Sequence, residues 1–224
     1  MADEHDVLLR EIDEDLKQER LFKLWKDYGN YAIAGVVAIV IGVAAFKGWQ
    51  NYSLALRMEQ GEFFAAAQEA ATKKHSDDAL IALQNLTQEA GRGYAMLARF
   101  RTAALMGEKG NSSEAANIYA TLADNGSIDK VYRELAVVLG ALQELNNTER
   151  SNKLIERAKN MAKTEGVWRH NAREIEALAA LANGKNTAAN AIFKELSNTA
   201  GIPQGIRARA REMLSITQQI KGPA

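Results

Sequence analysis

The ten residues SEAANIYATL at 113–122 decide the fold, because their pattern of small and large apolar residues occurs at two other places in the chain. The matching segments are DDALIALQNL at 77–86 and TAANAIFKEL at 187–196. In each, an alanine is followed four residues later by a large apolar residue and three residues after that by a leucine. Residues at this spacing share one face of an α-helix, where the alanine lets a partner helix approach. The nine positions are Ala79, Leu83, Leu86, Ala115, Tyr119, Leu122, Ala189, Phe193 and Leu196.

The distances between the three segments predict a fourth copy. The alanines are 36 and then 74 residues apart, and 74 is twice 37. An intervening copy should therefore centre near Asn152, where residues 147–160, NTERSNKLIERAKN, are typical of a helix whose pattern has decayed. A regular period of this length is the signature of a repeat array, in which each unit buries its apolar face against its neighbours.

The residues before each copy predict the shape of one repeat. Gly110 and Gly184 each stand five residues before the alanine, and Ala103 and Ala177 each stand seven residues before the glycine. A helix with a small packing residue, a glycine turn and a second helix form the layout of tetratricopeptide-type repeats. The period of about 37 and the lack of a proline at the repeat ends mark these repeats as divergent. The stretch QGIRARAREMLSITQQI at 204–220 predicts a final helix that caps the array.

Composition supports an all-α class and bounds the function. The chain has 224 residues and only two prolines, both near its end, so long helices meet few breakers. Lysine plus arginine equals aspartate plus glutamate at 28 each, which gives no overall basic excess of the kind that binds nucleic acid. Without cysteine there is no disulfide framework, no thiolate zinc site and no cysteine nucleophile.

An apolar run near the N-terminus predicts a membrane span. Residues 31–46, YAIAGVVAIVIGVAAF, carry no charge, and at about 1.5 Å per residue the run from Tyr28 approaches the roughly 30 Å of a bilayer core. Aromatic residues frame the run as they frame membrane spans at the headgroup level. These residues are Trp25, Tyr28, Tyr31, Trp49 and Tyr52. The alternative is a helix buried on all sides in a soluble domain.

Basic residues beside the span predict its direction. Four precede it closely and two follow, namely Lys17, Arg20, Lys23 and Lys26 before it and Lys47 and Arg57 after it. The positive-inside rule then places the N-terminus in the cytoplasm. The long charged region ahead of the span and the lack of a small-residue cleavage site favour a signal anchor over a cleaved signal peptide. We expect a charged, amphipathic cytoplasmic tail at 1–27, a transmembrane helix at 28–49 and the tetratricopeptide-like domain with its capping helix at 50–224.

Small residues recur every four positions within the span. Ala34, Ala38 and Gly42 would line one helical face, which is the pattern that lets another membrane helix approach closely. One interpretation is a docking stripe for a partner's membrane helix. The other is chance, since alanine and glycine are common in such spans, and both remain open.

Residues that often carry chemistry do not form a catalytic or metal site in the sequence. His5, His75 and His170 are widely separated and lack a second ligand at helical spacing. Asp77 and Asp78 stand where a helix begins, which favours capping and compensation of the helix dipole. Gly91-Arg92-Gly93 lacks the strand and third glycine of a phosphate loop. We therefore expect no enzyme activity, no metal and no cofactor.

A repeat array of this kind has a concave face that binds peptides or partner helices. Basic and aromatic residues on or beside the first helices of the repeats are candidates for that groove. They are Arg92, Tyr94, Arg99, Arg101, Arg133, Arg169 and Arg173. Binding of a protein partner and ordinary solvated charge explain them equally well.

The whole layout resembles a known family. A charged stretch that leads into the span, EIDEDLKQERLFKLWKDYGNYAIAG at 11–35, precedes divergent repeats that include GYAMLARFRTAAL at 93–105. This arrangement is similar to the bacterial inner-membrane family of ancillary subunits of the Sec translocon. The resemblance implies a periplasmic repeat domain beside the Sec channel, with translocon subunits, periplasmic chaperones, emerging secretory proteins and membrane lipid as partners. The alternative implied by the same resemblance is a structural coordinator of envelope assembly or cell division.

Overall fold

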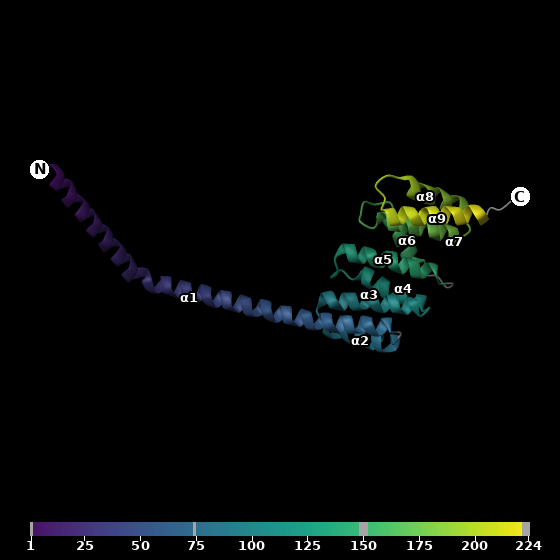
Figure 1. Cartoon of the computed structure of the whole chain (residues 1–224), viewed down its shortest axis with the longest axis horizontal. Helices are drawn as coiled ribbons and strands as arrows, with labels where there is room; N and C mark the ends of the chain where they lie inside the picture. The colour runs from purple at the N-terminus through teal and green to yellow at the C-terminus, as the bar shows by residue number, and fades with distance from the viewer. Residues whose placement is uncertain (1, 74, 148–151, 221–224) are drawn as a thin grey trace. The chain divides into compact units, whose positions relative to one another are not determined.

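The computed structural model describes residues 2–73, 75–147 and 152–220, and within these ranges the chain forms nine α-helices and no strand (Figure 1). The all-α prediction is confirmed. The helices are α1 (Ala2–Thr72), α2 (Ser76–Glu89), α3 (Arg92–Glu108), α4 (Ser112–Asp124), α5 (Lys130–Leu145), α6 (Lys153–Met161), α7 (Arg169–Ala182), α8 (Asn186–Asn198) and α9 (Gln204–Ile220).

The chain divides into two compact units, residues 1–58 and 59–224. In the described part of the chain, one helical stretch, Phe22–Thr72, is long and apolar enough to cross a membrane by length and composition. Only 6% of its most apolar window is buried. The framing aromatic rings are exposed as well, with Trp25 at 64% and Trp49 at 73%. The apolar run is therefore not buried against other parts of this chain within the described residues.

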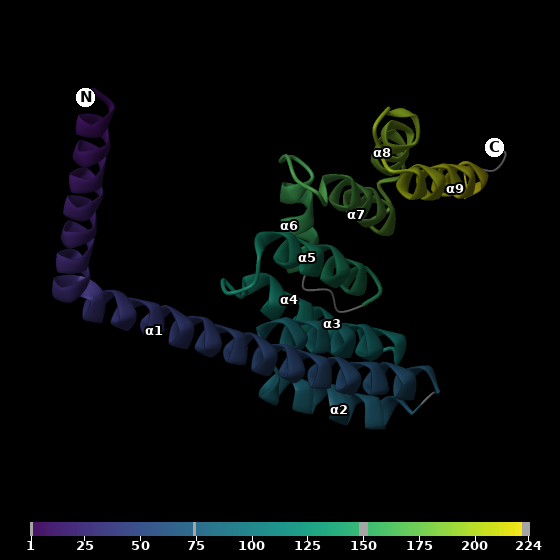
Figure 2. The same ribbon diagram turned by 60° about the vertical axis from the view of Figure 1, so that its left-hand side comes forward.

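The second unit is a stack of helical hairpins. Figure 2 shows the end of α1 beside α2, and α2 to α9 follow one another along the stack. The end of α1 packs with α2 and α3 in one apolar cluster, after which α3 pairs with α4, α5 with α6 and α7 with α8. The last helix, α9, packs on α7 and α8 through Ile206 and Ala210, which are 4% and 0% exposed. Its bounds agree with the predicted capping helix.

The repeating alanine, large apolar residue and leucine form the core of the stack. All nine positions predicted from the sequence are buried, and none is more than 6% exposed. The preceding helices contribute Ala103 and Ala177, each 0% exposed. Since a leucine or phenylalanine side chain gains about 1.5–3 kcal/mol when it is fully buried, the large positions of the pattern supply much of the driving force for stacking.

The fourth copy lies one residue earlier than the spacing predicts. Ile155 and Ala158 of α6 are buried and follow Tyr119 and Leu122 by 36 residues. The small position of this copy then falls on residue 151, which lies outside the described residues, as do 148–150. Asn152 is the residue before the helix, with a left-handed φ of 55°, so it starts α6 instead of packing in its face.

The predicted glycine turns close two of the hairpins. Gly110 and Gly184 have φ of +86° and +72°, a left-handed conformation that glycine adopts without a steric penalty. At the first turn, the N–H of Asn111 donates to the carbonyl of Met106 at 2.8 Å, and the N–H of Gly110 donates to Gly107 at 3.0 Å. This pair of bonds satisfies the last carbonyls of α3 and reverses the chain into α4.

Candidate functional site

Two clefts open on the second unit beside α3. The first, here named the α3–α5 cleft, has a volume of about 620 Å³ and lies between the start of α3, the loop after α4 and the start of α5. The second, the α2–α4 cleft, has a volume of about 410 Å³ and is lined by α2, α3 and α4. Both are large enough to hold several side chains of a bound peptide.

Two of the predicted groove residues line the α3–α5 cleft. They are Arg92 and Arg99, which stand seven residues apart on α3, and Arg99 also lines the α2–α4 cleft. Tyr132 and Ile128 face the same space from the start of α5 and the loop before it. Sequence reasoning did not single out these two apolar residues, because their approach to α3 depends on the stacking of two successive repeats.

Three other predicted groove residues form ion pairs inside the array, namely Arg101, Arg169 and Arg173. Arg101 binds Glu108 at 3.0 Å, and Arg169 pairs with Glu165. The predicted residues therefore do not form one continuous free basic surface.

Arg173 is the most strongly held of the predicted arginines. It binds Glu176 on its own helix and Glu195 on α8, each at 2.7 Å. The hydrogen bond to Glu195 is the main cause that raises the pKa of Arg173 above its ordinary value. This arginine joins the two helices of a hairpin, so its charge is already compensated by the fold.

The remaining two predicted residues are half-buried. The ring of Tyr94 lies 6.2 Å from that of Phe64, and its hydroxyl oxygen would lie only 2.8 Å from a Cβ at Gly61. Tyr94 thus seats the end of α1 on α3. Arg133 lies on α5 and lines neither cleft, and its Nε has no hydrogen-bond partner within the described residues.

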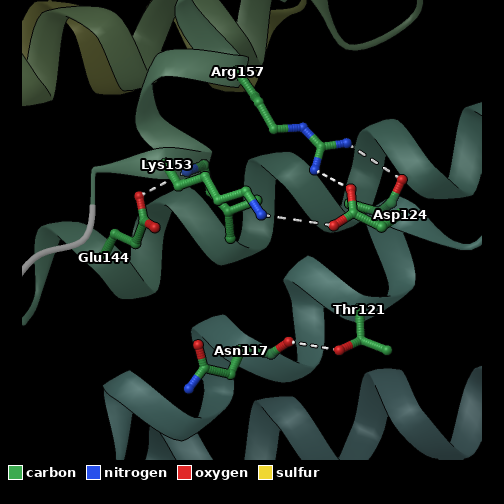
Figure 3. A network of polar contacts seen from close by, with 8 residues as sticks. Asn117, Thr121, Asp124, Glu144, Lys153 and Arg157 are labelled. Carbon is green, nitrogen blue, oxygen red and sulfur yellow. Dashed lines mark hydrogen bonds and ion pairs between the residues drawn. The ribbon is translucent and has the colours of Figure 1, made fainter.

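A polar network between α4 and α6 joins successive repeats (Figure 3). Arg157 reaches back to Asp124 at 2.6 Å and donates to the carbonyl of Ala123 at 3.3 Å. Lys153 approaches the other oxygen of Asp124 at 3.8 Å. No spacing rule in the sequence predicts these ion pairs, because the residues that form them are about one repeat apart and come into contact only when the repeats stack.

A buried carboxylate holds the start of α6. Glu144, 3% exposed at the end of α5, accepts hydrogen bonds from the N–H groups of Leu154 and Ile155, each at 3.0 Å. These are orphan donors of a helix N-terminus, where a negative charge is favourable. The contact is drawn at the left of Figure 3. It gives Glu144 a structural task and leaves its carboxylate inaccessible to a ligand.

The acidic pair at the start of α2 has one of its two predicted roles. The residue before the helix is His75, and no side chain caps it, so the capping role predicted for Asp77 and Asp78 is wrong. Both lie in the first turn, where they oppose the helix dipole. Asp77 accepts a hydrogen bond from Lys109 at 2.6 Å, and this bond lowers the pKa of Asp77. Among the described residues no group of three or more histidine or acidic side chains could hold a metal ion.

The small-residue stripe in α1 is open to the surroundings. Ala34, Ala38 and Gly42 are exposed, and a Cβ at Gly42 would meet no atom within 4 Å. This space is available to an approaching helix, and docking at the stripe stays a prediction.

Comparison with known proteins places the array in a family. The family described as tetratricopeptide repeat-like domain matches residues 23–210, which is most of the chain. No curated protein and no solved structure is significantly similar to the chain. Domains of this family type are typically non-catalytic modules that bind other proteins. The buried repeat pattern, the hairpin stack and this match lead to one conclusion: the chain belongs to the tetratricopeptide repeat-like domain family.

Proposed function

We propose that this chain is a membrane-tethered interaction protein that serves as an ancillary subunit of the Sec translocon. In this proposal the span anchors the chain beside the channel, and the array binds periplasmic chaperones or emerging secretory proteins. No catalytic activity and no cofactor are assigned. The surrounding lipid is the other partner of the span.

One observation carries the proposal: α1 contains both the candidate span and the first helix of the array. Phe64 and Ala67 of α1 pack in the core of the first repeat, and only residues 50–58 separate the repeat domain from the predicted span at 28–49. A tether this short would keep a protein-binding array close to the bilayer, where a translocating chain emerges. A freely diffusing adaptor would need no such junction.

The charge distribution supports the proposed direction. Residues 1–27 hold five basic and nine acidic side chains, and four of the five basic ones stand within eleven residues of the predicted span. Because orientation follows lysine and arginine near the span, whereas acidic residues contribute little, the N-terminus would be cytoplasmic. The array would then lie in the periplasm of a bacterial inner membrane.

Photocrosslinking within the span tests the translocon proposal. A photoreactive residue at Ala38 should yield an adduct with a channel subunit in intact membranes, because Ala38 lies in the middle of the small-residue stripe. The matched control is the same residue at Val40, which points about 200° around the helix and should crosslink mainly to lipid. Lipid or self-adducts alone from Ala38 would contradict the proposal.

Affinity purification of the full-length chain tests the partners of the array. After chemical crosslinking in living cells, the proposal expects periplasmic chaperones or secretory chains among the recovered proteins. Recovery of wall synthases in their place would favour the alternative function, coordination of envelope assembly or division. Either result would identify the side on which the array works.

A further inference from the structure

The α3–α5 cleft contains two arginines that the fold does not use. Within the described part of the chain, neither Arg92 nor Arg99 forms an ion pair or a side-chain hydrogen bond. Five other arginines of the array form ion pairs, namely Arg101, Arg157, Arg169, Arg173 and Arg209, whereas among the described residues Arg133, Arg207 and Arg211 form none. Arg92 and Arg99 differ from the other unpaired arginines because both line the same cleft, where their guanidinium groups can form charge-assisted hydrogen bonds to a bound anion.

Part of the surface beside these arginines is apolar. Met96 and Ile128 are half-buried against the core of the array, and the ring of Tyr132 is 42% exposed. Asp129 is the single carboxylate among the lining residues, so the side chains of the cleft carry a formal charge of two plus and one minus. The cleft thus combines a net positive charge with an apolar floor.

We propose that the α3–α5 cleft binds an acidic peptide segment of a partner protein, with carboxylates on Arg92 and Arg99 and an apolar side chain on Met96, Ile128 and Tyr132. This inference rests on the proposed function as an interaction protein and names the chemistry of its ligand. Guanidinium groups bind carboxylates with two parallel hydrogen bonds, which provides orientation as well as affinity.

The spacing of the arginines sets the spacing of the carboxylates. Arg92 and Arg99 are seven residues apart on one helix, which corresponds to about 10 Å along its axis. A peptide in the polyproline II conformation rises about 3.1 Å per residue with three residues per turn, so side chains three positions apart face the same side about 9 Å apart. The preferred ligand therefore has two acidic residues three positions apart with an apolar residue between them.

The apolar floor favours a peptide over a small anion. Phosphate or a lipid headgroup would satisfy the arginines and leave Met96, Ile128 and Tyr132 uncovered. A peptide side chain placed there would remove apolar surface from water, at about 25 cal/mol per Å². Both groups of lining residues are then used by one ligand.

Peptide binding to the full-length chain in detergent micelles tests the proposal. The probe is a fluorescein-labelled, proline-rich peptide of eight residues with two glutamates three positions apart and one phenylalanine between them. Fluorescence anisotropy should show saturable binding that weakens with added salt. A peptide with glutamine in place of both glutamates should bind at least about tenfold more weakly, because it lacks the charge-assisted bonds.

Substitutions in the cleft locate the site. The pair Arg92→Glu with Arg99→Glu, and separately Arg92→Gln with Arg99→Gln, should each weaken binding at least about tenfold while the circular dichroism spectrum is unchanged. The matched control is Arg211→Glu on α9, an exposed arginine without an ion pair among the described residues, which should bind as the parent does.

Four results would overturn the inference: no binding of the acidic peptide, equal affinity for the glutamine peptide, unchanged affinity of both paired variants, or displacement by inorganic phosphate at the peptide's own concentration. The translocon proposal fails separately, through the crosslinks at Ala38. If the chain binds the acidic peptide selectively but forms no channel adduct, the cleft proposal is supported and the translocon proposal is contradicted.

Discussion

At the scale of single residues, Tyr119 shows how deeply the repeat pattern is buried. Its side chain is 3% exposed in the largest core cluster, and burial raises the pKa of its phenol to about 12. The nearby Arg101 opposes this shift and Glu108 adds to it. The neutral phenol is therefore the form that the fold requires, whereas a tyrosine in an unfolded chain ionises at about pH 10.

This difference predicts a loss of stability in alkaline solution. The contribution of Tyr119 is fully present below about pH 10, where both states are protonated, and is lost as the pH rises toward 12, because only the unfolded chain gains the charge. Between about pH 9 and about pH 11.5 the loss amounts to about 2 kcal/mol. Urea unfolding of the full chain in micelles at both values measures it. Between the two pH values, the Tyr119→Phe variant should lose less stability than the parent by this amount. Equal losses in the two proteins would contradict the raised pKa of Tyr119.

Gly140 marks a close approach of helices beside the same cluster. A Cβ at this position would collide with Cδ1 of Leu154 and lie 2.8 Å from Cβ of Tyr119. Gly140→Ala should therefore destabilise the array by about 1–2 kcal/mol in spite of the better helix propensity of alanine. The control is Gly93→Ala in the first turn of α3, where no atom lies within 4 Å and no loss of stability is expected. Thermal unfolding distinguishes the two, and a stabilised Gly140→Ala variant would contradict the packing argument.

At the scale of elements, a forked ion pair fastens the capping helix. Nε and Nη2 of Arg209 on α9 bind the two oxygens of Glu174 on α7, each at 2.7 Å. The Glu174 side chain is only 11% exposed, and the hydrogen bond to it raises the pKa of Arg209. The cap therefore covers the last repeat with matched charge as well as with Ile206 and Ala210.

Removal of this pair should loosen α9. Arg209→Ala leaves a buried carboxylate without its partner, at a cost of about 1–2 kcal/mol after allowance for the half-exposed arginine. Amide hydrogen exchange of α9 should accelerate by about tenfold for each 1.4 kcal/mol by which the free energy of opening this helix falls. Arg209→Lys should rescue only part of the effect, since an ammonium cannot form the fork. Arg211→Ala, an exposed change on the same helix, should leave the exchange unaffected; an equal acceleration there would refute the role of the fork.

The junction between α5 and α6 depends on Glu144. Glu144→Ala removes the acceptor of two buried N–H groups and should cost about 2–3 kcal/mol. Glu144→Gln keeps one acceptor oxygen and loses the charge, so its free energy of unfolding should lie between those of the parent and of Glu144→Ala. Urea unfolding provides the measurement, with the exposed Glu212→Ala as control. If Glu144→Ala unfolds like the control, the carboxylate does not hold the helix.

The sequence predicts these elements better than it predicts their polar contacts. Apolar spacing identified the helices because burial of a helix face follows a local period, as Ala115, Tyr119 and Leu122 show. Asp124 and Arg157, by contrast, are 33 residues apart and meet only through stacking, so no local rule finds them. For the same reason the sequence does not predict that Arg92 and Arg99 line a cleft, whereas Arg173 forms an ion pair with another helix.

At the scale of the whole molecule, the predicted topology gives the repeats their location. In the proposed function the span determines where the protein works, whereas the array provides only the capacity to bind a partner. A chain of this composition allows a direct test, because it contains no cysteine. A single introduced cysteine is then the sole thiol, and the parent chain provides a background without label.

Maleimide labelling of single-cysteine variants should establish the direction of the span. In intact spheroplasts of an expressing bacterium, a membrane-impermeant maleimide should label Ser113→Cys, which is exposed at the start of α4, and should label Ala2→Cys only after lysis. The expected order follows from the positive-inside rule, under which the basic residues Lys23 and Lys26 would hold the N-terminal side in the cytoplasm. Labelling of Ala2→Cys first would reverse the topology, and recovery of both variants in the soluble fraction would remove the tether on which the proposed function depends.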